Sequence, residues 1–149
     1  MINIKTTKLL EKRLGNFEDY RGRLNYFNEL DLSNFRRFYF ITHTTTQSVR
    51  AWQGHPEESK VFIPTRGDFI IAAVKIDNFK SPSKDLKPNI FRLSSRHKSA
   101  LIIPKGFANG LKATTSDSEL LVFSEFELAQ SVNEKVRFDQ NLWINWNEY

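Results

Sequence analysis

The feature that most constrains the fold is a series of short β-prone segments that runs along almost the whole chain. Each segment is rich in β-branched and aromatic residues, and together they cover residues 23–30, 36–44, 48–53, 59–65, 68–76, 89–94, 99–104, 110–115, 118–128 and 142–146. Turn-forming residues separate them at spacings of roughly 8–12 residues, which is typical of a sandwich or barrel rather than of a βαβ fold. Only residues 6–15 have a pattern that could form a helical turn. The sequence therefore predicts one all-β domain over residues 1–149.

The composition is that of a folded protein with its own core. Hydrophobic residues make up 40% of the chain and charged residues 26%. Thirteen Phe and three Trp indicate that aromatic rings fill much of the core. The chain has no Cys, which excludes disulfides and thiolate nucleophiles and suits a reducing compartment. No segment has the apolar run of a signal peptide or a membrane span, so we expect a cytoplasmic protein with no membrane partner.

Charge narrows the classes of ligand. The net charge is +5, from 22 Lys and Arg against 17 Asp and Glu. A basic surface attracts anions such as nucleic acids, phosphorylated metabolites or acidic lipids. The cations are scattered along the chain without a long basic run, which argues against a nucleic-acid footprint. We therefore expect no nucleic-acid partner.

The segment "RAWQGHPEESK", Arg50–Lys60, is the densest group of reactive side chains. It places one histidine, two carboxylates and two cations in a turn between apolar strands. Histidine is the side chain whose ordinary pKa suits proton transfer near neutral pH. From these residues alone, His55 is either a chemical group at the mouth of a pocket or a polar residue in a turn.

Strand periodicity limits which side chains can share a pocket. Alternate residues of a strand face the same way, so Arg37, Tyr39 and His43 are expected on one face. The same rule puts Arg50 and Gln53 on opposite faces, unless a bulge changes the register of that strand.

Several motifs resemble those of one enzyme superfamily. The stretch "IIPKGFANG" is similar to the second cupin signature, Pro-x-Gly-x-x-His, with Asn109 in the place of the histidine. Further landmarks, in the order found in dTDP-4-dehydrorhamnose 3,5-epimerases, are Arg21-Gly22, Arg50–Gln53, Lys60–Phe62, Ser81-Pro82, "GFANG" and residues 139–146. The chain is also similar to sugar 3,4-ketoisomerases, whose Arg-Gly-x-His-Ala-His motif keeps its second histidine here as His55. The resemblance implies a cupin-type antiparallel jelly-roll sandwich or barrel.

The resemblance also implies an activity. These families move a proton on the carbon beside a ketone in a nucleotide-linked sugar. The expected function is that of a nucleotide-sugar epimerase, of the dTDP-4-keto-6-deoxyhexose type, in deoxysugar or surface polysaccharide biosynthesis. Three departures keep two alternatives open: Gln53 replaces the base histidine, Asn109 replaces a further histidine, and Phe123 stands where the epimerases have a proton-donating tyrosine. The alternatives are a sugar 3,4-ketoisomerase and a catalytically degenerate homologue that binds a nucleotide sugar.

The matched positions supply candidate roles. The resemblance implies His55 as the base, Lys60 as the group that stabilises the enolate oxygen and Asp139 as the carboxylate that orients the base. Tyr39, which shares a strand face with Arg37 and His43, could replace the missing tyrosine as the acid. Four residues are expected to bind substrate, namely Arg21, Arg50, Gln53 and Asn109. No cofactor is expected, and no metal, because the first motif offers one histidine with Glu57 or Glu58 and the second offers Asn109. The resemblance further implies a homodimer with an exchanged N-terminal strand, in which Arg21 serves the neighbouring site.

Overall fold

The computed structural model describes residue 2 and residues 5–149, and in this part of the chain short strands predominate. In chain order the strands are β1 (Leu10–Arg13), β2 (Gly15–Asp19), β3 (Gly22–Tyr26), β4 (Arg37–His43), β5 (Val49–His55), β6 (Lys60–Arg66), β7 (Asp68–Lys75), β8 (Asn89–Ser94), β9 (Ser99–Ile103), β10 (Phe107–Ala113), β11 (Ser118–Ser124) and β12 (Val136–Arg137). One α-helix, α1 (Leu128–Glu134), and three 3-10 turns, η1 (Leu32–Asn34), η2 (Ser95–His97) and η3 (Trp146–Glu148), complete the described elements. None of the helices described is long and apolar enough to cross a membrane.

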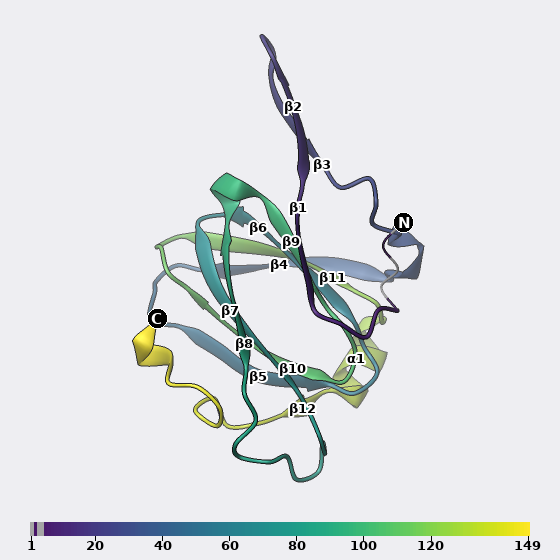
Figure 1. Cartoon of the computed structure of the whole chain (residues 1–149), viewed down its shortest axis with the longest axis vertical. Coiled ribbons are helices and arrows are strands. Elements are labelled where there is room, and N and C mark those ends of the chain that lie inside the picture. Colours follow the sequence, from purple (N-terminus) through teal and green to yellow (C-terminus); the bar gives the residue numbers. More distant parts are fainter. Residues whose placement is uncertain (1, 3–4) are drawn as a thin grey trace.

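The strands form two five-stranded sheets that face each other (Figure 1). One sheet has the order β1-β9-β6-β11-β4 and the other β12-β5-β10-β7-β8, and the ladders between named strands are antiparallel. Strands β2 and β3 form a separate hairpin, the arm, that projects away from the sandwich (Figure 1). The predicted all-β antiparallel sandwich is confirmed.

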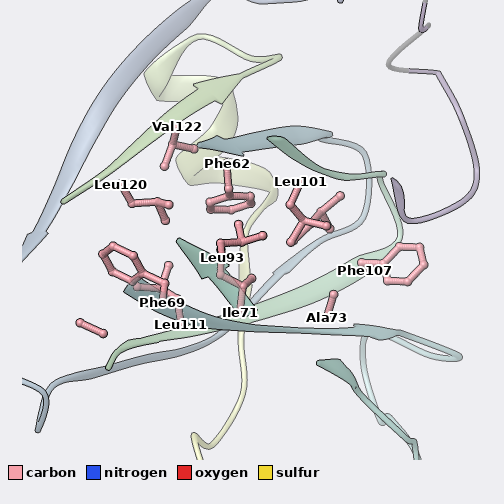
Figure 2. Packing of buried hydrophobic residues seen from close by; sticks show 12 residues of the cluster. Phe62, Phe69, Ile71, Ala73, Leu93, Leu101, Phe107, Leu111, Leu120 and Val122 are labelled. Atoms are coloured by element: carbon pink, nitrogen blue, oxygen red, sulfur yellow. The ribbon is translucent and has the colours of Figure 1, made fainter. Parts of the chain in front are cut away.

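The core lies between the two sheets because alternate side chains of each strand point inward. Its buried members come from six strands and are Phe62, Phe69, Ile71, Ala73, Leu93, Leu101, Ile103, Phe107, Leu111, Ala113, Leu120 and Val122 (Figure 2). Full burial of a Leu, Ile or Phe side chain contributes about 1.5–3 kcal/mol, so this layer is the main source of stability.

A second core covers the outer face of the sheet that contains β5. The tail after β12 places Trp143 and Trp146 against Trp52, with ring centroids 5.2 and 5.8 Å away. The indole of Trp143 donates to the carbonyl of Ser83 at 2.9 Å. A Cβ on Gly110 would lie 2.6 Å from the Trp146 ring, so the tail packs this closely only because residue 110 is glycine. The expected strand at 142–146 is wrong, since these residues pack through their rings and not through a ladder.

Two further expectations from the sequence, at residues 6–15 and 118–128, are wrong. Residues 6–15 form no helical turn, because β1 pairs with β9 from Leu10 opposite Ile102 to Arg13 opposite Ser99. The expected strand at 118–128 ends at Ser124, and α1 begins at Leu128. The helix is held by side chains that bond across the fold, which local sequence patterns do not show.

Candidate active site

A cleft of about 350 Å³ lies between β4 and β5 and is flanked by α1. We call it the cationic cleft because five of its lining residues are Arg37, Arg50, Lys60, Lys135 and Arg137. The neutral and apolar lining residues are Tyr39, Phe40, Ile41, Thr42, Gln53, Leu128, Ser131 and Val132. No carboxylate is among these lining residues, all of which belong to the described part of the chain.

A bulge in β5 brings two of the expected substrate-binding residues into this cleft. Gln53 pairs with Asn109, but Arg50 pairs with Leu111, so residues 51 and 52 lie opposite the single residue Gly110. The additional residue puts Arg50 and Gln53 on the same inward face, while Trp52 faces the outer core. The regular alternation expected for β5 is therefore wrong, and the bulged alternative applies. Asn109 is buried beside Gln53 in the ladder.

The cations of the cleft are poorly compensated. Among the described residues, Arg50, Lys135 and Arg137 have no ion-pair partner, whereas Arg37 donates to the carbonyl of Phe126 at 3.2 Å. Burial lowers the pKa of Lys135, and the positive charges of Arg137, Lys60 and Arg37 lower it further. Like charges held together in this way favour a bound anion, which would relieve their repulsion.

Lys60 and Tyr39 form a pair at the inner wall of the cleft. The ammonium of Lys60 donates to the hydroxyl oxygen of Tyr39 at 3.1 Å and is itself buried. Because the Tyr39 oxygen accepts this bond, its own proton remains available, and no acceptor for it occurs among the described residues. The structure thus brings together two of the expected catalytic residues, each on a strand of the same sheet.

His55 belongs to a buried cluster behind that pair. Its Nδ1 lies 2.5 Å from Glu134 Oε1 and 3.2 Å from Glu58 Oε2. Glu58 also accepts a bond from Ser131 Oγ at 2.6 Å and one from Ser124 Oγ, and lies 3.6 Å from Lys60 Nζ. Glu58 therefore connects the histidine to the cationic cleft.

The charge state of Glu58 fixes the role of each His55 nitrogen. Burial acts to raise the pKa of Glu58, but bonds from His55, Ser124 and Ser131, together with the Lys60 charge, lower it to about 2. Glu58 is thus an anion at neutral pH. Two carboxylates at Nδ1 require a proton there, which leaves Nε2 as the nitrogen with a free lone pair. Nε2 is buried and has no partner among the described residues.

The cluster has the residue types of a metal site, since one ligand atom each of His55, Glu58 and Glu134 lie within 4.8 Å of one another. Its chemistry does not call for a cation. The Lys60 ammonium already lies beside Glu58, and the bonds from His55, Ser124 and Ser131 already use its oxygens. A divalent ion would have to displace these donors and lie near an ammonium. The expectation of no metal stays a prediction.

Two expected site residues lie outside this assembly. Asp139 is exposed after β12, and its Oδ1 accepts from the backbone N–H of Asn141 at 2.9 Å. Glu134 instead supplies the carboxylate that contacts His55. Arg21 follows β2 at the end of the arm, where it pairs with Asp19 at 2.6 Å (Figure 1).

Phe123 does not occupy the inner position expected from the epimerase tyrosine. Its ring packs on the outer face of the sheet against Phe35 and Phe38, with centroids 5.7 and 6.2 Å away. The adjacent residue, Ser124, is the one that bonds to Glu58. Phe123 is therefore not among the residues that line the cationic cleft.

Sequence reasoning missed five residues of the site, namely Arg37, Glu58, Glu134, Lys135 and Arg137. A signal existed for Arg37, which shares a strand face with Tyr39, and for Glu58, which is three residues from His55. Glu134 lies in α1, Arg137 lies in β12 and Lys135 links the two, and tertiary contacts set the position of this segment beside β5.

No protein-family model matches the chain, and no curated protein matches it. Solved structures do match. The dTDP-4-dehydrorhamnose 3,5-epimerase from Bacillus anthracis has a TM-score of 0.76 at 18% identity and covers 98% of this chain and 87% of its own. A 3,4-ketoisomerase from Helicobacter canadensis has a TM-score of 0.70 at 20% identity, with coverages of 89% and 92%. A 3'-monoepimerase from Streptomyces bikiniensis has a TM-score of 0.71 at 14% identity, with coverages of 88% and 69%. These likenesses confirm the cupin-type jelly-roll fold expected from the sequence.

Proposed function

We propose that this chain is a nucleotide-sugar epimerase that binds its substrate in the cationic cleft and moves a proton on the carbon beside a ketone. The observation that carries the proposal is the convergence of Arg50, Lys135 and Arg137, without acidic partners among the described residues, above the Lys60–Tyr39 pair. A diphosphate supplies the missing negative charge, and guanidinium groups match its oxygens well. The proposed substrate class is a dTDP-4-keto-6-deoxyhexose.

Lys60, His55 and Tyr39 can each carry out one part of the proton transfer. A ketone oxygen beside the Lys60 ammonium would be stabilised as it becomes an enolate. His55, held with its proton on Nδ1, would remove the proton through Nε2, and Tyr39 would deliver one from its free O–H. Because Nε2 is buried, this role requires the sugar to reach the depth of Lys60. Strands β5 and β4 belong to opposite sheets, so base and acid would approach from two sides, as an inversion at carbon needs.

Two alternatives remain as second candidates. The Arg50–Lys60 spacing and His55 match the ketoisomerase motif, in which one histidine can both remove and return the proton. A degenerate binding protein is supported by Gln53, which cannot accept a proton at neutral pH, and by Asn109. Tyr39 and His55, the proposed acid and base, lie on strands of opposite sheets, which favours an epimerase over the two alternatives.

Exchange of deuterium from solvent tests the reaction. With dTDP-4-keto-6-deoxyglucose in deuterated water, label at C3 or C5 with the ketone still at C4 supports epimerisation. A ketone at C3 identifies a ketoisomerase, and a raised melting temperature without exchange identifies a binder. We expect His55→Asn to abolish exchange and Tyr39→Phe to reduce it, while both variants still bind dTDP.

We propose a homodimer in which the arm is exchanged with the partner, within a cytoplasmic pathway of deoxysugar or surface polysaccharide synthesis. The arm exposes Phe17, Leu24 and Tyr20, the last at 96%. An isolated two-stranded hairpin is marginally stable in water, so these exposed apolar side chains need a surface to cover them. Arg21 would then reach the partner's cleft. Light scattering at micromolar concentration should give the mass of two chains, and deletion of residues 16–25 should give one.

A further inference from the structure

A second cavity, of about 440 Å³, lies apart from the cationic cleft and shares none of its lining residues. We call it the lysine cavity. Its lining comes from five segments and consists of Lys5, Thr6, Thr7, Glu57, Ser59, Lys75, Lys105 and Glu125. The turn before β6 separates the two hollows, since Glu57 and Ser59 face the lysine cavity while Glu58 between them faces His55.

The two carboxylates of the lysine cavity are already bound. Glu57 Oε2 pairs with Lys105 Nζ at 3.2 Å, and Glu125 Oε2 accepts from the backbone N–H of Ser59 at 2.9 Å. Ser59 Oγ accepts from the backbone N–H of Lys105 at 3.2 Å, so its own hydroxyl proton is available to a ligand. The lining holds three lysines and two glutamates, so its formal charge is +1.

Lys75 has no acidic partner among the residues that the structure describes. Its ammonium lies 5.0 Å from the centroid of the Phe107 ring, a cation–π contact that holds it at the wall of the cavity. A Cβ on Gly106 would lie 2.6 Å from this nitrogen, and Gly106 has a φ of +83°. The backbone at this turn favours glycine, and the flexible end of Lys75 lies directly beside it.

We propose that the lysine cavity binds a small phosphate-type anion, such as a phosphomonoester, between Lys75, Lys105 and the Ser59 hydroxyl. Lys75 offers an ammonium with no acidic partner among the described residues, and Lys105 would share its ammonium between Glu57 and the phosphate oxygens, since lysine binds phosphate as a compact point charge. The cavity is large enough for a phosphorylated metabolite of modest size, and its lining comes from separate segments of the chain. This site is distinct from the proposed substrate cleft and does not depend on its function.

Titration with inorganic phosphate at constant ionic strength tests the site, with backbone amide NMR signals as the local readout. We expect saturable shifts at Ser59, Lys105 and Gly106 in the full chain. Lys75→Met should abolish them, whereas Lys80→Met, an exposed lysine outside the cavity, should leave them unchanged. Arg50→Met should also leave them unchanged, which separates this site from phosphate bound in the cationic cleft.

The outcomes that overturn the proposal are equally specific. Shifts that rise linearly with phosphate, or that sodium chloride reproduces at equal ionic strength, show screening and no site. Shifts that persist in Lys75→Met place the anion elsewhere. Because Lys75 is exposed, its variant should keep the melting temperature of the parent protein, and Lys75→Glu provides a second variant with a reversed charge. Failure here leaves dTDP binding in the cleft unaffected, so the two proposals fail independently.

Discussion

Two groups of charges meet at Lys60 and are balanced in opposite ways. In the buried cluster, Glu58 and Glu134 face His55, Lys60 and two serine hydroxyls, so each carboxylate has partners within hydrogen-bond range. In the cationic cleft, Arg50, Lys135 and Arg137 find no acidic partner among the described residues. The first arrangement contributes to the stability of the fold, and the second keeps charge available for a ligand. Charge in the same small region therefore serves two purposes, and substitutions can tell them apart.

The largest effect is expected from Glu58→Gln. The lowering of the Glu58 pKa from 4.5 to about 2 corresponds to about 3 kcal/mol of folding free energy. A folded-state pKa below the unfolded value stabilises the protein above pH 4.5, and this contribution is lost as the pH falls toward 2. Urea unfolding at pH 7 should show a loss of about 3 kcal/mol in the variant, and a smaller gap at pH 3.

Glu57→Gln is the matched control for that experiment. Glu57 is exposed and pairs with Lys105 at the surface, so its replacement should change the unfolding free energy by less than about 1 kcal/mol. Equal losses at the two positions, or a Glu58 gap that is the same at pH 3 and pH 7, would contradict the assignment of the buried cluster to stability.

Arg50→Met should have the next largest effect, and on binding rather than on folding. Loss of one charged hydrogen-bonding group to a phosphate corresponds to about 1.5–3 kcal/mol, or roughly a 10- to 100-fold weaker affinity for dTDP. The unfolding free energy should stay level or rise slightly, because a source of repulsion is removed. Arg36→Met, on the exposed side of the neighbouring strand segment, should alter neither property. A large loss of stability in Arg50→Met would contradict the proposal that the charges of the cationic cleft serve binding, whereas those of the buried cluster serve stability.

The smallest effect concerns His43, which lies beyond the inner end of the cleft. Burial lowers its pKa, and the Arg50 charge lowers it further. A depressed pKa means that the folded state resists protonation, so stability is lost as the pH falls below 6.5 through the folded value. Both ring nitrogens are buried without partners among the described residues. His43→Phe should flatten the dependence of unfolding free energy on pH below 6.5, and an unchanged slope would contradict the assignment.

The sequence predicted the fold well because the fold rests on local alternation. The inward residues of β7, β9 and β11 recur with period two, and the resemblance supplied the two-sheet arrangement. The sequence predicted the tail poorly. Trp143 and Trp146 are of a residue type common in strands, but they pack by ring contacts against Trp52. Helix α1 was missed because Ser131 and Glu134 are fixed by Glu58 and His55, more than seventy residues earlier in the chain.

Part of the candidate site was predictable from motifs and from the alternation of side chains along the strands. His55, Lys60 and Tyr39 were indicated by motif and strand face, and the structure places them close together or joined through Glu58. Arg50 and Gln53 are three residues apart, a spacing that shares a strand face only at a bulge, and that bulge is visible only in the pairing with β10. Asp139 was indicated by the tail motif, but the position of α1 gives Glu134 the contact with His55.

The tail and β12 have a consequence for how the chain reaches its native state. Synthesis proceeds from the N-terminus, so β5 emerges long before β12 can pair with its edge and before the tail can cover Trp52. Until then β5 has an open edge and an uncovered indole, both of which promote association with other chains. The same late segment carries Lys135 and Arg137, so one stretch of chain supplies both a wall of the cleft and the cover of the sheet. A chain truncated before β12 would therefore lack both the cover over Trp52 and two cations of the cleft, so it should associate with other chains and bind the ligand weakly.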